Sequence, residues 1–162
     1  MHWHSRHVPL GKTGQTVTAL GLGGVCWKLL DDDAAAVEVV HRAIDLGITY
    51  LDSASGYKDC ERKLGLALKE WDRDNLFVAA KCIKRFGDEV KQEIAQSFED
   101  LGVETIDLIQ LHAIDQQEGQ PLKASALSIS RCSWRTSLLV GTTARSTSLS
   151  TRARPSATEP KI

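Results

Sequence analysis

The feature that most constrains the fold is an alternation of strand-like and helix-like segments at nearly constant spacing. Four apolar segments end near Gly23, Asp52, Lys81 and His112, so successive ends are 29, 29 and 31 residues apart. An amphipathic helical stripe lies in each of the three gaps between successive strand-like segments. This alternation predicts a parallel sheet with helices packed outside it. A steady unit of this length is typical of a (β/α)₈ barrel, although doubly wound sheets use similar units.

We predict strands over residues 16–22, 48–52, 76–81 and 106–112, with a turn over 10–14 before the first. Three apolar stripes predict the intervening helices: Val37, Val40 and Ile44; Leu64, Leu68 and Trp71; and Val90, Ile94, Phe98 and Leu101. The acidic residues 31–33 offer N-terminal caps for the first helix. Gly47 and Gly102 stand where C-terminal caps belong.

The glycines after the first predicted strand invite a dinucleotide-binding interpretation. Gly21 and Gly23 match the start of a Gly-x-Gly-x-x-Gly fingerprint, but its third glycine would fall at Cys26. Gly24 follows Gly23 directly. The simpler interpretation is that these glycines let the backbone turn tightly at a strand end.

Polar side chains stand where three of the predicted strands end. Asp52 ends the second strand, Lys81 the third and His112 the fourth, and Tyr57 lies in the loop after the second. Because the carboxyl ends of parallel barrel strands form one face, we expect these four side chains to share one site. No single polar strand end is unusual, but three of them together with a loop tyrosine predict chemistry there.

This set suits protonation of a carbonyl oxygen. A tyrosine is a weak acid with an ordinary pKa of about 10, and a nearby ammonium favours its phenolate form. An aspartate can hold the lysine in place, and a neutral histidine can orient the substrate oxygen. None of these side chains supplies a hydride, so reduction would need a nicotinamide cofactor.

Four segments together resemble the aldo/keto reductase superfamily. Residues 10–14 and 19–24 resemble its N-terminal signature. Residues 47–57 resemble its Gly-Ile-x-x-x-Asp-Thr-Ala-x-x-Tyr motif, with Ser53 in place of threonine, and residues 106–115 resemble its fourth-strand motif. The resemblance covers residues 8 to about 118. It implies an α/β fold, the first four βα units of a (β/α)₈ TIM barrel, and NADPH-dependent interconversion of small carbonyl compounds and alcohols.

The resemblance also implies roles for individual residues. Tyr57 is expected to be the general acid, tuned by Lys81 and Asp52, and His112 is expected to orient the substrate carbonyl.

Further residues follow from the same resemblance. We assign Gly23, Gly24 and Asp52 to cofactor binding. Trp27 lies where the family often lines its substrate pocket, with simple loop packing as the alternative. Glu61 stands where the family has a glutamate near the start of the second helix, with a solvated helix acid as the alternative.

The composition changes near Gly119, which divides the chain into residues 1–119 and residues 120–162. The first part carries 13 Lys/Arg and 20 Asp/Glu, whereas the second carries 7 Lys/Arg, one acid and 15 Ser/Thr. We expect residues 1–119 to form half of a reductase barrel and residues 120–162 to be an irregular tail. A complete barrel takes about 250 residues. The hypothesis for the tail is a frameshift or a truncated gene.

We expect the four catalytic positions to be complete but the truncated chain to be inactive alone, because the second half of the barrel is missing. Two alternatives to a reductase remain open. A half barrel would leave sheet edges exposed, so the chain could instead be non-catalytic and act by self-association through them. The basic tail could bind nucleic acid, but it lacks interleaved aromatic residues, and we do not expect that partner.

Composition also bears on compartment and metals. The longest apolar runs are far shorter than the ~18 residues that span a bilayer, and the N-terminus does not resemble a secretory signal. No two of the four cysteines have Cys-x-x-Cys spacing, so we expect reduced thiols, a cytoplasmic location and no metal site. His2, His4 and His7 could together bind a metal, but a frayed terminus is the simpler interpretation.

Overall fold

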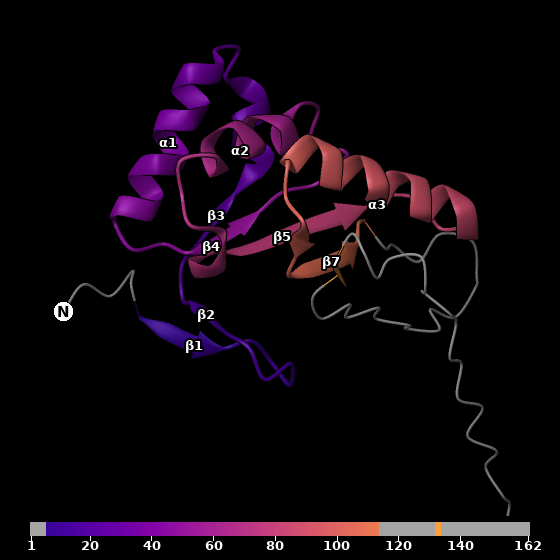
Figure 1. The fold of residues 1–162 in the computed structure, drawn as a ribbon, viewed down its shortest axis with the longest axis horizontal. Helices are drawn as coiled ribbons and strands as arrows, with labels where there is room; N and C mark the ends of the chain where they lie inside the picture. Colours follow the sequence, from indigo (N-terminus) through magenta and orange to yellow (C-terminus); the bar gives the residue numbers. More distant parts are fainter. Residues whose placement is uncertain (1–5, 114–131, 134–162) are drawn as a thin grey trace, which may run out of the picture.

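The computed structural model describes residues 6–113 and 132–133 (Figure 1). The chain opens with an antiparallel hairpin of β1 (His7–Pro9) and β2 (Thr16–Thr18), which pairs Val8 with Val17. The connecting turn contains Gly11 and Gly14, both at positive φ, as expected for the turn predicted over residues 10–14.

The central sheet has four parallel strands, β3 (Gly21–Gly23), β4 (Tyr50–Asp52), β5 (Phe77–Cys82) and β7 (Leu108–Leu111). Their spatial order, β3-β4-β5-β7, follows their order along the chain. A doubly wound sheet would reverse this order and carry helices on both faces. The fold is therefore the α/β barrel type, and the described residues contain three complete βα units and a fourth strand.

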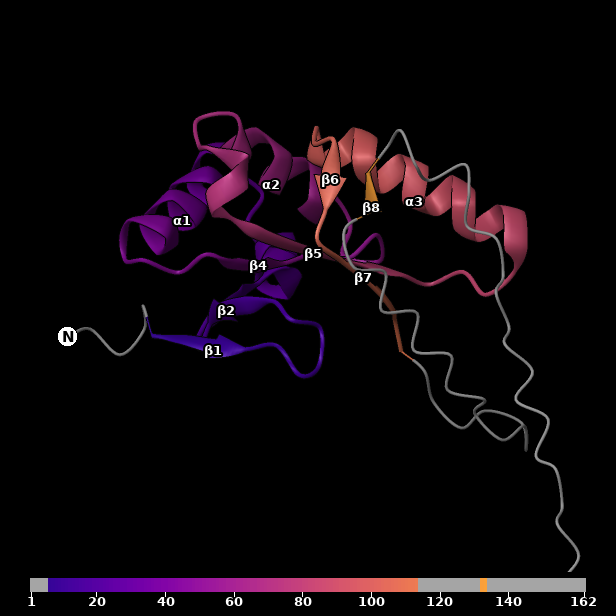
Figure 2. The same cartoon turned by 60° about the horizontal axis from the view of Figure 1, so that its bottom comes forward.

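Three helices connect these strands: α1 (Asp33–Asp45), α2 (Cys60–Leu68) and α3 (Gly87–Leu101). All three lie on one side of the sheet, and the β1–β2 hairpin lies on the other (Figure 2). Asp32 caps α1 by accepting from the Ala34 amide, and Gly102 ends α3 in a left-handed conformation. Short 3₁₀ helices at Gly24–Leu29 and Arg73–Asn75 complete the described connections.

Two apolar clusters cover the two faces of the sheet. The larger lies between the sheet and the helices and includes Leu51, Val78, Leu64 and Leu101. A smaller one, formed by Val17, Phe77 and Ala79, lies toward the hairpin. Because β5 is buried against both layers, it lacks the alternating pattern of a strand with one wet face.

The predicted first strand over 16–22 is wrong, because that segment divides into β2 and β3, which belong to different sheets. Thr18 is the physical reason. Its buried hydroxyl donates to the Leu20 carbonyl at 2.8 Å and accepts from the amides of Thr49 and Tyr50 at 3.2 Å. The chain bends there and joins the hairpin to the start of β4.

The predicted fourth strand also divides, into β6 (Thr105–Ile106) and β7. The division falls at Asp107, whose carboxylate accepts from the Val78 amide at 2.9 Å and from Arg73 at 2.6 Å. A two-residue strand, β8 (Cys132–Ser133), pairs antiparallel with β6. The proposed boundary at residue 119 and the other residues of the predicted tail lie outside the described residues.

Within the described residues, no helix is both long and apolar enough to span a membrane. His2 and His4, which the sequence raised as metal ligands, lie outside the described residues.

Candidate active site

The four chemically active side chains predicted from the strand ends meet at the carboxyl ends of the sheet. Asp52 is the last residue of β4, Lys81 lies near the end of β5, and His112 directly follows β7. Tyr57 comes from the loop between β4 and α2. The parallel strands pair in register, so their carboxyl ends lie along one edge of the sheet, where barrel enzymes have their active sites.

Lys81 is held by two oxygen acceptors. Its ammonium forms an ion pair with Asp52 and donates to the Ser53 carbonyl at 2.9 Å. The side chains of Lys81 and Asp52 are 15% and 26% exposed. Partial burial strengthens this pair relative to one fully in water, so the ammonium has a fixed place in the site.

Tyr57 lies between the lysine and the histidine. The Lys81 Nζ atom stands 5.1 Å from the centre of the Tyr57 ring, within cation–π range. The rings of Tyr57 and His112 meet edge to face, with centres 5.1 Å apart and planes at 86°. The structure thus gathers a phenol, an ammonium, a carboxylate and an imidazole around one point.

His112 has an unsatisfied nitrogen. Its Nδ1 atom is buried and has no hydrogen-bond partner among the described residues. A buried polar atom without a partner costs free energy, which a bound ligand can recover.

Backbone strain occurs beside two of these residues. Lys58 and Ala113 have φ of 53° and 49°, and in the described part of the chain they are the non-glycine residues with positive φ. Each directly follows a side chain of the site, Tyr57 or His112. Such strain persists where surrounding contacts impose it, and it is common at functional sites.

The glycines assigned to the cofactor differ in their surroundings. A Cβ atom at Gly24 would lie 2.3 Å from Cys60 Sγ and 2.9 Å from the Asp52 carbonyl oxygen, so close packing within the protein already requires glycine there. A Cβ atom at Gly23 would have nothing within 4 Å. Gly23 therefore leaves room at the end of β3, beside Asp52.

Trp27 is almost fully buried. Its side chain is 2% exposed and belongs to the large cluster between the sheet and the helices. This burial fits loop packing, the alternative, and the substrate-pocket role of Trp27 stays a prediction. An indole of this size gains more from burial in the core than from an exposed loop position.

Glu61 is not a solvated helix acid. It is 3% exposed, and its Oε2 accepts from the Ser97 hydroxyl of α3 at 3.1 Å. Burial raises the pKa of Glu61 to about 7, with Asp100 and Glu93 adding repulsion.

Three contacts close to the site were not anticipated from the sequence. Ser55 donates to Glu93 at 2.5 Å, Cys82 donates to Glu93 at 2.6 Å, and Arg85 donates to the His112 carbonyl. Cys82 is 2% exposed.

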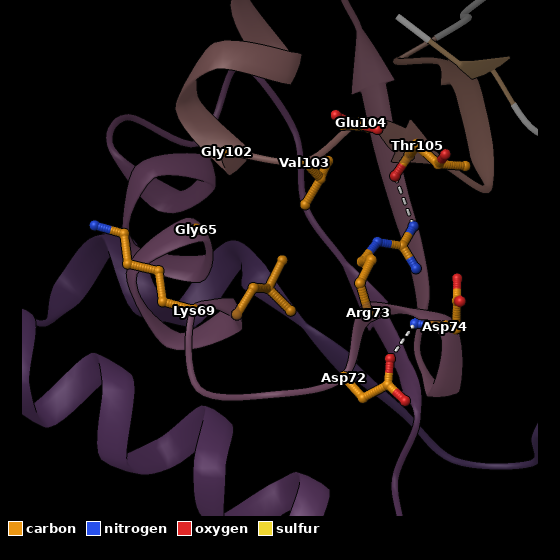
Figure 3. Close-up of a pocket in the computed structure, with 10 residues that line it drawn as sticks. Gly65, Lys69, Asp72, Arg73, Asp74, Gly102, Val103, Glu104 and Thr105 are labelled. Atoms are coloured by element: carbon orange, nitrogen blue, oxygen red, sulfur yellow. Dashed lines mark hydrogen bonds between the residues drawn. The ribbon is translucent and has the colours of Figure 1, made fainter.

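A cavity of about 350 Å³ lies at the other end of the strands, lined by residues that include Gly65, Arg73, Gly102 and Thr105 (Figure 3). Arg73 crosses it and donates to the Thr105 carbonyl at 2.7 Å. None of the four side chains at the strand ends reaches it. The chemistry and this cavity are therefore at separate places.

One observation fits a cofactor over the strand ends: the open space at Gly23, beside Asp52. It concerns only the reacting end of a nicotinamide cofactor. Among the cations near these strand ends, Lys81 is paired with Asp52, and Arg85 is engaged with backbone carbonyls.

Known proteins of one family resemble the chain in sequence. The sequence model of the aldo/keto reductase family matches residues 19–129. The NADH-specific methylglyoxal reductase of Escherichia coli is 27% identical over 135 residues, covering 66% of this chain and 41% of that protein. The NADPH-dependent D-xylose reductase of Candida boidinii is 31% identical over 117 residues, covering 68% and 35%.

Solved structures give the same result. The holo form of an aldo-keto reductase from Bacillus halodurans superposes with a TM-score of 0.58 at 29% identity, covering 65% of this chain and 39% of that one. A structure from Pseudomonas aeruginosa, assigned to the aldo-keto reductases, gives a TM-score of 0.62 at 29% identity, covering 70% and 49%. The chain spans less than half the length of these relatives. The matched segment and the barrel topology together show that the chain belongs to the aldo/keto reductase family.

Proposed function

We propose that the chain carries the proton-transfer centre of an NADPH-dependent reductase that converts a small aldehyde or ketone to an alcohol. The observation that carries this proposal is the convergence of Asp52, Tyr57, Lys81 and His112 at the carboxyl ends of β4, β5 and β7. Four separate segments supply these groups.

Tyr57 donates its phenolic proton to the carbonyl oxygen as that oxygen gains negative charge. The Lys81 ammonium, fixed by Asp52, stabilises the phenolate that remains. His112 orients the substrate oxygen through a ring nitrogen. The alcohol then leaves, and Tyr57 regains a proton from water, so the residues return to their starting state.

When bound, a reduced nicotinamide would supply the hydride for the carbonyl carbon. Gly23, Gly24 and Asp52 are the residues of this half that we assign to holding its reacting end. The named relatives use NADH in one case and NADPH in another. Our choice of NADPH rests on the resemblance of the sequence to the family.

The free thiols at Cys26, Cys60 and Cys82 favour a reducing compartment, and we place the protein in the cytoplasm.

The test is turnover by the full chain, followed through oxidation of NADPH or NADH with a panel of small aldehydes and ketones. Tyr57→Phe should lower turnover by about 10²- to 10⁴-fold, the usual range for a general acid, and should leave cofactor binding intact. Tyr50→Phe is the matched control, because Tyr50 lies against Phe77 on β5 with ring centres 5.2 Å apart. Equal turnover in the Tyr57→Phe variant and in the unchanged chain would refute the role given to Tyr57.

A second function is favoured by the two edges of the sheet. Among the described residues, no strand pairs with the outer edge of β3 or of β7. Such edges present unpaired N–H and C=O groups to other chains. A non-catalytic fragment would associate through these edges. Sedimentation velocity of the full chain would then show a dimer, and the fluorescence of added NADPH would show no binding. A monomer that reduces carbonyls excludes this second function.

A further inference from the structure

Glu93 lies on α3, outside the four strand-end residues, yet its carboxylate reaches two loops of the site. Its Oε1 atom accepts from the Ser55 hydroxyl at 2.5 Å and from the Ile83 amide at 3.2 Å. Its Oε2 atom accepts from the Cys82 thiol at 2.6 Å and from the Lys84 amide at 2.8 Å. Each oxygen thus takes one bond from a side chain and one from the backbone.

These donors stand beside the residues that the proposed chemistry uses. Ser55 belongs to the loop after β4, two residues before Tyr57. Cys82, Ile83 and Lys84 directly follow Lys81. Ser55 also contacts the Lys81 carbonyl oxygen, through its amide at 3.2 Å and its hydroxyl at 3.1 Å. A hydroxyl has one hydrogen to give, and the shorter bond to a carboxylate is the stronger.

The loop that Glu93 holds also reaches the fourth strand. Arg85, the next residue along, donates to the carbonyl oxygen of His112 and to that of Ala113, the latter at 3.4 Å. The β5–α3 loop therefore touches the backbone at His112 while Glu93 fixes its start. Through this loop, one carboxylate is connected to the surroundings of Tyr57, Lys81 and His112.

The chemistry of the carboxylate fits this task. Partial burial acts to raise the pKa of Glu93, but hydrogen bonds from Cys82, Ser55 and the two amides outweigh it and hold the pKa at about 2. The group is ionised at neutral pH, and charged acceptors make the stronger hydrogen bonds. Burial and the neighbouring Glu93 raise the pKa of Cys82 to about 12, so the thiol keeps the hydrogen that it donates.

We infer that Glu93 is a positioning residue of this site, joining the β4–α2 loop to the β5–α3 loop so that Tyr57 and Lys81 keep their relative placement. The inference rests on the proposed function for its catalytic consequence, and on the contacts above for its structural one. Neither the carboxylate nor its donors touch the reacting atoms. Its effect is transmitted through the loops.

A graded pair of variants tests the inference in the full chain. In Glu93→Gln, one amide oxygen replaces two carboxylate oxygens, so at most one of the two pairs of donors keeps its acceptor. In Glu93→Leu, both pairs lose it. Glu99→Gln is the matched control, because Glu99 is an exposed glutamate of the same helix.

The first readout needs no activity. Amide hydrogen exchange at Ile83 and Lys84 should speed up about 10- to 100-fold in Glu93→Leu, as expected when a hydrogen bond to a charged group is lost, and less in Glu93→Gln. The ring signals of Tyr57 and His112 in NMR spectra should shift in the same order. Glu99→Gln should leave exchange and ring signals unchanged. Unchanged exchange and ring signals in Glu93→Leu would overturn the inference.

The second readout separates positioning from general stability. We expect Glu93→Gln to lower kcat about 10- to 100-fold while KM changes less than about threefold, since small misplacements of reacting groups cost this much. A KM change without a kcat change would also overturn the inference. If the unchanged chain shows no turnover, the proposed function fails, and exchange and ring signals still decide the role of Glu93. If Glu93→Leu does not fold, Ser55→Ala, which removes one donor and keeps the carboxylate, must shift the Tyr57 ring signal.

Discussion

Replacing Glu61 with glutamine should make the protein more stable near neutral pH and remove most of its pH dependence between mildly acidic and neutral conditions. Glu61 is 3% exposed between α2 and α3. Its Oε2 accepts from Ser97, whereas its Oε1 is buried without a hydrogen-bond partner among the described residues. Glutamine keeps the shape and a hydrogen-bonding group, and it removes the charge that burial penalises.

The size of the effect follows from the pKa. Burial raises the pKa of Glu61 from its ordinary value of 4.5 to about 7. Between these values the folded protein binds a proton that the unfolded chain releases, so stability falls as the pH rises through this window. At about 1.4 kcal/mol per pH unit, the full loss is about 3 kcal/mol, and it is complete above a pH of about 7.

The assay is urea unfolding of the full chain, followed by far-UV circular dichroism at about pH 5 and about pH 8, which lie near the two sides of this window. The unchanged protein should lose about 2 to 3 kcal/mol between the two conditions, and Glu61→Gln should lose much less. Glu99→Gln, on the exposed side of α3, should behave like the unchanged protein. An equal loss in the unchanged protein and in Glu61→Gln would refute the reasoning.

Two further substitutions test packing and strain. Gly65→Ala should destabilise the fold by about 2 kcal/mol or more, because the new Cβ would lie too close to the Asp100 carbonyl oxygen of α3. Gly23→Ala is the control, since a Cβ atom there has nothing within 4 Å. Equal melting temperatures of the two variants would contradict this prediction. Lys58→Gly should stabilise the fold by up to about 1 kcal/mol, because glycine accepts the φ of 53° that lysine adopts at a cost. Urea unfolding measures this gain, and a loss of stability would show that the Lys58 side chain contributes more than its backbone strain costs.

The convergence of the site could be predicted because it depends on topology. Once residues 48–52, 76–81 and 106–112 are taken as parallel strands, their final residues must share an edge, whatever the details of packing. The helix signals at Asp32 and Gly102 are also local, since each cap depends on a residue's own backbone conformation. The site could therefore be predicted from topology, and the helix ends from local sequence.

The divided strands could not be predicted in the same way. The break after β2 depends on the Thr18 hydroxyl, which accepts hydrogen bonds from the amides of residues 49 and 50. The break at Asp107 depends on its carboxylate, which accepts hydrogen bonds from Val78 and Arg73. These partners are about 30 residues away in the sequence. Apolar periodicity gives no indication of contacts at that distance.

Glu61 and Glu93 show where a usable signal was overlooked. Glu61 precedes Leu64 by three residues and Leu68 by seven, which places it on the apolar face of α2. Glu93 follows Val90 by three residues and precedes Ser97 by four, at the edge of the α3 stripe. The spacing indicated an inward direction for both, but it could not indicate the opposite environments that raise one pKa and lower the other.

The most direct test of the central claim is to follow the transferred hydrogen. The full chain is incubated with a small aldehyde and NADPH that carries deuterium at the transferable position of the nicotinamide ring, and the product is analysed by mass spectrometry. If the strand-end residues perform carbonyl reduction, the alcohol carries one deuterium at the former carbonyl carbon, and Tyr57→Phe forms about 10²- to 10⁴-fold less of it than Tyr50→Phe does. An alcohol without deuterium, or equal amounts of labelled alcohol from the two variants, would contradict the account.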